Sequence, residues 1–182
     1  MHFWKHFRTI THHRHLVMIG CFRMGLLWQG LTHDLSKYSP TEFLNGAKYY
    51  QGNRSPNVAE RADKGYSEAW MHHKGHNRHH YEYWTDLTPD RVYGPIEVPL
   101  RYVAEMVADR IAACKTYLGK DYYPGSELDY LNRATETHLM HPNTVALLRG
   151  LLERLRDEGE AKTFAYLRKL LKEEKAKPPL QK

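Results

Sequence analysis

The adjacent residues His33 and Asp34 place an imidazole and a carboxylate side by side at a predicted turn. Both side chains can reach a metal ion that lies over such a turn, and the two ligand types together suit Mn, Fe, Zn or Ni. Chance often produces a histidine followed by an aspartate, and Asp34 could instead cap a helix. The pair therefore indicates a metal site only in combination with ligands from other parts of the chain.

Histidine is abundant, with 13 residues, and it is clustered. Five histidines fall in residues 2–15, one is His33, five fall in residues 72–80, and the last two are His138 and His141. Histidine is the commonest metal ligand and also an acid–base group near neutral pH. The clusters predict chemistry of this kind, whereas His138 and His141 flank a predicted helix break and are expected to cap it or face solvent.

The first cluster overlaps a helix that we predict over residues 9–28. Apolar residues recur there at helical spacing, and His13 falls on the same stripe, four residues before Val17. His12 and His15 project to either side of the stripe and remain alternatives to His13. We expect His13 to face the interior.

Asp109 interrupts an apolar helix predicted over residues 99–118. A buried carboxylate is costly unless it is paired or bound to a metal ion. The alternatives to a metal are an ion pair with Arg101 or Arg110 and an exposed stripe formed with Glu105 and Lys115.

The second histidine cluster, residues 72–80, allows two arrangements. If it is one helix, a single face carries His72, His76 and either His79 or His80. If the helix breaks at Gly75, then His73 ends it and His79 and His80 begin a new element. Most of these five side chains must be solvated or satisfied in the core. Glu82 is placed to orient a ligating imidazole, as such ligands usually require.

The order of these parts resembles the HD-domain superfamily of metal-dependent phosphohydrolases. His13 with Val17 is similar to its first element, HxxxV. Residues 31–37 are similar to its LxHDxxK element, with Ser36 where glycine is commoner, and residues 107–112 are similar to its closing aspartate helix. The gap between the first two elements is short for the superfamily. The chain looks closest to a bacterial and phage branch that shares HDxSK, NxHHxE and EMxxD.

The resemblance implies an HD-like helical bundle with one or two divalent ions (Mn, Fe, Zn, Co or Ni). The implied ligands are His13, His33, Asp34, His73, His80 and Asp109. His73 and His80 resemble the extra histidines of two-metal members, such as the HD-GYP phosphodiesterases and the di-iron inositol oxygenase. No Gly-Tyr-Pro sequence follows this histidine cluster, however. His72 and His79 are near alternatives for this pair.

The function expected from the resemblance is hydrolysis of a phosphate ester, such as a nucleotide or a related phosphomonoester or diester, by a metal-activated water. Lys37 could grip a non-bridging oxygen or could be a surface lysine, and Glu82 or Glu105 could shuttle a proton or orient a ligand. One alternative is a di-iron oxygenase or redox enzyme with the same ligands. The other is a non-catalytic, histidine-rich metal-binding or interaction protein.

The positioning elements are helical. The 182 residues suit one domain, and the pattern predicts an all-α bundle of six to eight helices without a sheet. Besides the helices above, we predict helices over residues 40–51, 58–74, 126–140, 143–157 and 160–176, and a loop over residues 85–98. We expect an HD-like domain over residues 1–158 and a C-terminal amphipathic helix with a basic tail over residues 159–182.

The composition of the chain indicates which partners and which cellular compartment to expect. The net charge of +6 comes partly from the C-terminal segment, which reads as a solvated tail, so nucleic acid is not expected as a partner. The two cysteines lie in apolar helical patterns, which favours a reducing cytoplasm over disulfides. The best candidate for a membrane span, residues 16–31, is interrupted by Arg23, and no signal peptide is seen, so no membrane partner is expected. The oligomeric state stays open.

Overall fold

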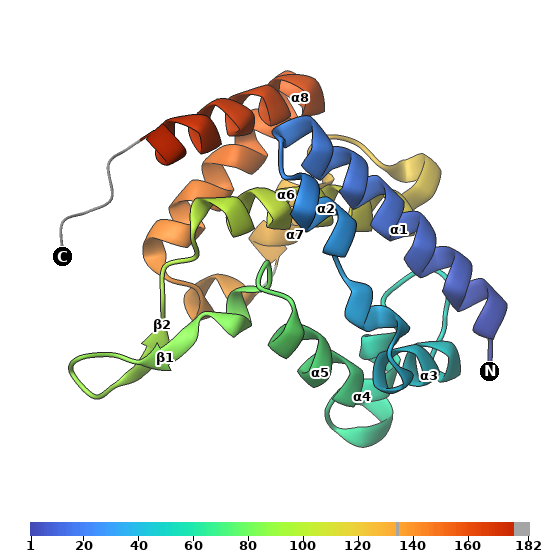
Figure 1. The fold of residues 1–182 in the computed structure, drawn as a ribbon. Helices are drawn as coiled ribbons and strands as arrows, with labels where there is room; N and C mark the ends of the chain where they lie inside the picture. Colours follow the sequence, from blue (N-terminus) through green and yellow to red (C-terminus); the bar gives the residue numbers. More distant parts are fainter. Residues whose placement is uncertain (134, 177–182) are drawn as a thin grey trace.

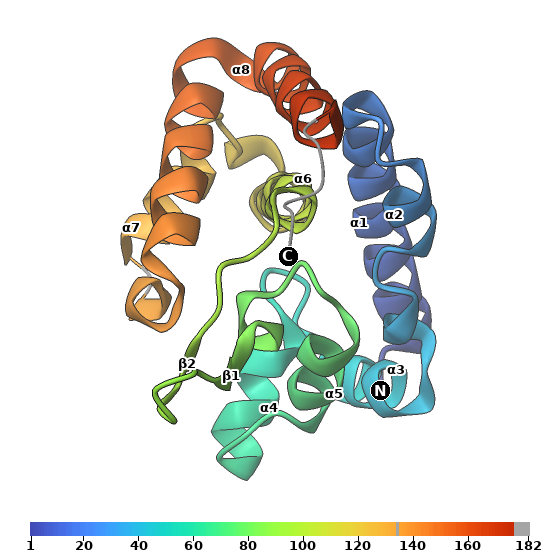
Figure 2. The same cartoon turned by 60° about the vertical axis from the view of Figure 1, so that its left-hand side comes forward.

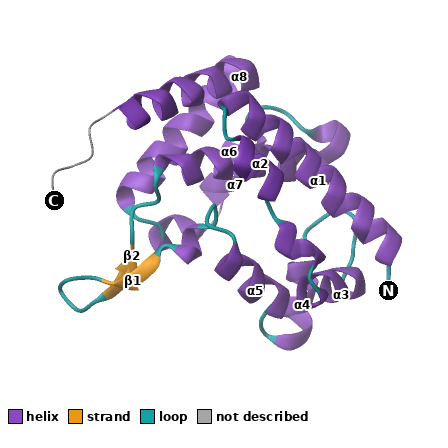
Figure 3. Ribbon diagram, in the orientation of Figure 1, coloured by secondary structure: helices purple, strands orange, loops and turns teal. Residues whose placement is uncertain are grey.

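The computed structural model of the protein describes residues 1–133 and 135–176. Over these residues the chain forms eight α-helices and a small sheet (Figures 1 and 3). The helices are α1 (Phe3–Met24), α2 (Leu27–Thr32), α3 (Pro40–Lys48), α4 (Pro56–Lys64), α5 (Glu68–His76), α6 (Leu100–Leu118), α7 (Ser126–Arg133) and α8 (Pro142–Ala176). Four 3-10 helices join them: η1 (Leu35–Tyr38), η2 (Tyr81–Tyr83), η3 (Gly119–Asp121) and η4 (Thr135–Leu139).

The sheet is a two-stranded hairpin in which β1 (Thr85–Leu87) pairs antiparallel with β2 (Tyr93–Pro95). The prediction of six to eight helices is confirmed, and the prediction of no sheet is wrong. Strands of three residues are too short to show the alternation by which a strand is recognised in a sequence. The hairpin occupies most of the region predicted as a loop.

Helix α6 lies at the centre of the fold, as its apolar composition predicts. In Figure 2 it is seen end-on between α1 with α2 on one side and α7 with α8 on the other. The core joins residues from α1, α6 and α8, including Val17, Met24, Val107, Ile111, Leu148, Leu152, Leu155 and Leu167. Burial of side chains of this size stabilises the fold by about 1.5–3 kcal/mol each. This packing holds α1 and α6 against each other and so sets the distance between the residues they carry.

Two glycines divide segments that we predicted as single helices. Gly25 has φ 82° and ends α1, so residues 9–28 are not one helix, and residues 16–31 are shared between α1 and α2. Gly65 has φ 80° and ends α4, and Ser67 then caps α5 by accepting a hydrogen bond from the Trp70 backbone N–H. Both glycines adopt left-handed backbone angles that L-residues rarely take. Among the described residues, no helix is long and apolar enough to cross a membrane.

The last helix, α8, contains the two segments predicted as separate helices. They meet at Gly159, whose φ of 78° and ψ of 171° are not helical and kink the element. Phe164, Leu167 and Leu171, beyond the kink, are buried in the same core as Leu148 before it. Of the predicted basic tail, residues 177–182 lie outside the described residues.

Candidate metal centre

The helices and one turn bring four of the predicted ligands together. We call this group site A; it consists of His13 on α1, His33 and Asp34 after α2, and Asp109 on α6. His13 Nε2 lies 2.9 Å from Asp109 Oδ1 and 3.8 Å from Asp34 Oδ2. His33 Nε2 lies 3.3 Å from Asp34 Oδ2 and 3.5 Å from Asp109 Oδ1. Three segments far apart in the sequence thus converge on one point.

The turn after α2 explains how His33 and Asp34 both face site A. His33 is extended, with φ −49° and ψ 126°, and Asp34 is left-handed, with φ 52° and ψ 28°. Aspartate adopts this region more readily than most residues. Asp34 precedes η1, but its side chain caps no backbone N–H there, and it is fully buried. The capping alternative for Asp34 is therefore wrong.

A second group shares Asp34. We call it site B; it consists of Asp34, His73 near the end of α5, and His79 and His80 in the following loop. The Nε2 atoms of His73 and His79 lie 3.3 and 3.5 Å from Asp34 Oδ1, the carboxylate oxygen that faces away from site A. Asp34 is thus the one residue common to two adjacent ligand sets.

A buried carboxylate behind the rings orients a histidine of each site. Glu105 Oε1 accepts hydrogen bonds from Nδ1 of His33 at 2.9 Å and of His79 at 3.2 Å, while Gln29 donates to Oε2 at 2.9 Å. Burial alone would raise the pKa of Glu105, but bonding to the two imidazoles lowers it to about 2. Because each Nδ1 donates to a carboxylate, Nε2 of each ring is the atom that faces Asp34, and it would bind a metal ion on losing its proton.

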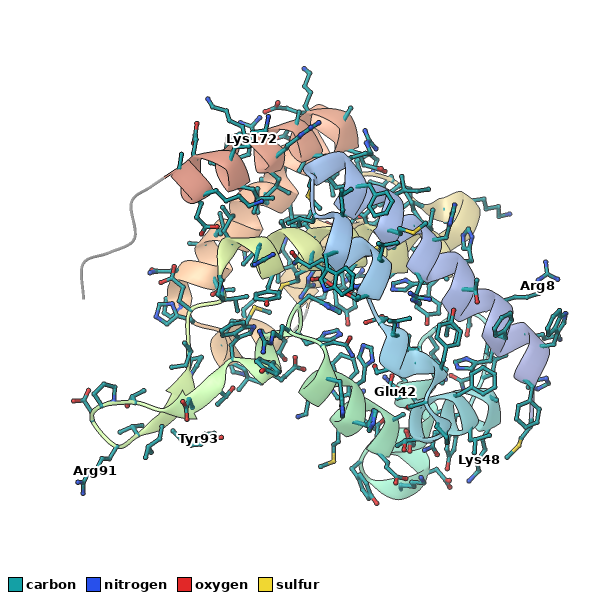
Figure 4. All side chains as sticks on the ribbon, viewed as in Figure 1. Arg8, Glu42, Lys48, Arg91, Tyr93 and Lys172 are labelled. Atoms are coloured by element: carbon teal, nitrogen blue, oxygen red, sulfur yellow. The ribbon has the colours of Figure 1, made fainter. Side chains whose placement is uncertain are left out.

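Glu42 on α3 holds the histidines of α5 in the same way. Its two oxygens accept hydrogen bonds from Nδ1 of His72 and of His73, each at 2.7 Å. Its backbone N–H donates to Ser39 Oγ at the start of α3, while its carboxylate turns inward to the histidines. Figure 4 labels Glu42 where α3 faces α5.

The ligand atoms lie in positions that suit shared ions better than hydrogen bonds to one another. Asp34 Oδ1 and the Nε2 atoms of His33, His79 and His80 are buried without a hydrogen-bond partner among the described residues. Such groups cost free energy when nothing satisfies them. Two ligand atoms that each lie about 2.1 Å from one ion are about 3.0–3.4 Å apart. The separations across both sites cluster around this range, so the residues fit a metal centre.

The charges of the site also favour cations. Burial alone would raise the pKa of Asp34, but the charges of His33 and Lys37 hold it well below its ordinary value. Burial would likewise raise the pKa of Asp109, and the adjacent imidazoles of His13 and His33 hold it low. Both carboxylates are therefore ionised at neutral pH, which is the form that binds metal ions. Lys37 Nζ lies 2.5 Å from Asp34 Oδ2.

A cavity of about 450 Å³ opens onto both sites. Its walls include His13, His73, His79, His80 and Asp109, together with Lys37 and Glu82. Arg110 and Cys114 of α6 and Glu127, Tyr130 and Arg133 of α7 also line it. A small charged molecule can therefore reach the ligand atoms from a pocket that contains several cationic groups.

The structure brings the six predicted ligands together, and two further residues belong to the same arrangement. His79, given only as an alternative, lies in site B with Nε2 toward Asp34, and Glu42 was not proposed as an orienting residue. The helix α5 ends at His76, with Asn77 as its C-cap, rather than at Gly75, and His79 follows this break. The contact of Glu42 with His72 and His73 joins residues far apart in the sequence, so no pattern of neighbouring residues indicates it. The side chains of His12, His15, His76 and His138 are exposed.

Glu127, at the far side of the cavity, is a buried titratable group outside both sites. It is fully buried, and this burial raises its pKa from 4.5 to about 7. Because the folded-state pKa lies above the unfolded value, the folded protein binds the proton more tightly. The contribution of Glu127 to the free energy of unfolding is therefore largest below pH 4.5 and is lost as the pH rises to about 7.

Replacing Glu127 by Gln removes this loss, because the amide stays neutral. The quantity to compare is the free energy of unfolding of the variant minus that of the wild type. We expect this difference to be about 3 kcal/mol larger at pH 8 than at pH 4, because only the wild type loses stability over this range. Urea unfolding of both proteins at the two pH values measures the difference. Replacement of the exposed Glu97 by Gln is the control, and an equal response of the two variants would contradict the assignment.

Comparison with known proteins adds a family. A family model described as a family of unknown function, DUF5662, matches residues 2–154, a span that contains every residue of sites A and B. No curated protein and no solved structure matches the chain. Since the match covers most of the sequence, the chain belongs to the DUF5662 family.

Proposed function

We propose that this protein is a metal-dependent hydrolase of phosphate esters, with a centre of the HD-domain kind. One observation carries the proposal: Asp34 is fully buried and offers one oxygen to each of two converging ligand sets. The residue order His13, His33–Asp34, Asp109 over a helical bundle adds the resemblance noted in the sequence. Site A and site B would each hold one divalent ion, chosen among Mn, Fe, Zn, Co and Ni.

The residues around the sites have separate tasks. Bound divalent ions would lower the pKa of a water molecule and neutralise charge on phosphoryl oxygens. The residues of the chain would bind the ions, orient their ligands and enclose the substrate. Glu105 and Glu42 keep the imidazoles in the correct tautomer, and Lys37 can donate to a non-bridging oxygen. The cavity along α6 provides room for the organic part of a nucleotide or a similar ester.

The same ligands are also compatible with two other functions, which experiment separates. We would measure the metal content of the purified protein and then screen phosphate release from nucleotides and simple esters with Mn and Co added. Stoichiometric metal with turnover supports the proposal. Paired iron with a visible absorption band and no turnover would identify a redox enzyme instead. Absence of both metal and turnover, with full helicity in chelator, would indicate a non-catalytic module.

Replacing Lys37 by Ala tests the role of the lysine that contacts Asp34. Loss of a charge-assisted hydrogen bond to the substrate costs about 1.5–3 kcal/mol. We therefore expect kcat/KM to fall about 10- to 100-fold while the metal content is retained. The matched control replaces Lys48, an exposed lysine outside the cavity. Turnover that is equal in the two variants would show that Lys37 does not act on the substrate.

A further inference from the structure

The outer side of α1 and α2 exposes large apolar side chains. Trp28 is 75% exposed, Trp4 71%, Leu27 59% and Leu31 51%. Large apolar side chains that a folded protein leaves in water can mark a surface that contacts a partner. We call this surface, formed by α1 and α2 with these four residues, Ile19 and Phe22, the α1–α2 face.

The packing of α2 determines which residues are left outside. Gly30 faces α1, where a Cβ would come within 3.0 Å of Cys21 and Phe22. Gln29 points to the core side and bonds the Arg101 carbonyl oxygen and the Glu105 carboxylate. The remaining residues of this short helix, with Leu27 and Leu31 among them, must therefore face away from the core. The orientation follows from the fold and cannot be relieved by rotating the helix.

Helical spacing continues the same face along α1. Trp4, Arg8, His15 and Phe22 recur on the side opposite the buried stripe that carries His13. Trp4 stacks on Phe7 with ring centroids 5.6 Å apart. Figure 4 shows Arg8 projecting outward from α1, away from the rest of the molecule.

The charge of this region has a single sign. Residues 1–33 contain no Asp or Glu, and the first acidic residue, Asp34, is fully buried. Lys5 and Arg8 are exposed, and neither forms an ion pair within the part of the chain that the structure describes. The α1–α2 face therefore combines aromatic and aliphatic groups with unpaired positive charge.

We propose that the α1–α2 face binds the surface of an anionic membrane. Tryptophan and leucine side chains enter the interface between headgroups and acyl chains, and lysine and arginine remain at the headgroups. A second copy of the chain fits less well, because it would bring an identical set of positive charges without any acidic partner. Nucleic acid would leave Leu27, Leu31 and Ile19 without contacts. The contact is peripheral and requires no membrane-spanning helix, a possibility that the sequence pattern did not suggest.

Cosedimentation with lipid vesicles tests the proposal independently of any enzymatic activity. The full chain is mixed with vesicles of phosphatidylcholine alone or of phosphatidylcholine with phosphatidylglycerol. We expect binding to the anionic vesicles that weakens at high salt. The double variant Lys5→Glu/Arg8→Glu should bind at least about tenfold more weakly, because each lost charge weakens binding about fivefold. Trp4→Ser/Trp28→Ser should also weaken it about tenfold or more.

Matched controls come from another exposed apolar surface, the hairpin. Val92→Ser/Tyr93→Ser, at 61% and 71% exposure, should bind vesicles as the wild type does. Circular dichroism checks that each variant is folded. The proposal is overturned if the wild type binds neither kind of vesicle. It is also overturned if the charge variant and the tryptophan variant both bind anionic vesicles as well as the wild type does. It is also overturned if sedimentation velocity shows a dimer that the Trp28 substitution dissociates, or if DNA binds and vesicles do not.

Discussion

Replacing Asp34 by Ala is expected to remove metal from both sites at once, because one carboxylate serves both. The metal content of the purified variant should fall to background, and hydrolytic turnover should fall at least about a thousandfold, since bound metal contributes several kcal/mol to such reactions. Elemental analysis and phosphate release measure the two effects. This is the largest effect expected of a single substitution in the protein.

Single-site variants make the test of Asp34 specific. His13→Ala should empty site A, His80→Ala should empty site B, and each should leave the other site partly filled. His76→Ala, in the same histidine cluster but exposed, should retain full metal content. Unfolding of the wild type in chelator and of Asp34→Ala shows whether both are folded without metal. Metal retained at the wild-type level in folded Asp34→Ala would refute the shared-carboxylate arrangement.

Replacing Glu105 by Gln is expected to weaken metal binding at both sites, although Glu105 is not in either ligand set as we define them. Its carboxylate holds Nδ1 of His33 in site A and of His79 in site B. Loss of such an orienting partner usually lowers metal affinity about 10- to 100-fold. Chelator competition with Zn or Co as the probe measures the affinity of each site.

The comparison with Glu42→Gln tests the geometry behind this expectation. Glu42 bonds a ligand of site B, His73, so its loss should weaken site B more than site A. Glu97→Gln, at an exposed position, is the control for a general effect of losing one negative charge. If Glu105→Gln and Glu97→Gln bind metal equally well, then Glu105 does not orient the ligands.

Local patterns were sufficient for the parts of the fold that repeat along the chain. The stripe through His13 and Val17 and the apolar run around Asp109 predicted that these two regions are helical, because burial recurs at the period of a helix. Helix ends were predicted less well: Gly25 and Gly65 break helices where a single glycine is compatible with either outcome. The three-residue strands of the hairpin left no periodic signal at all.

The sequence by itself predicted a helical protein, a turn at His33 and Asp34, a histidine on the apolar stripe of the first helix and an aspartate within the apolar helix that follows residue 99. Only the tertiary structure decided which histidines of the second cluster face Asp34. Their orientation depends on Glu42 and Glu105, which lie 31 and 26 residues from the His73 and His79 rings that they bond. When two bonded residues lie so far apart in the sequence, the packing of helices against each other decides which side chains meet. The spacing of neighbouring residues does not contain that information.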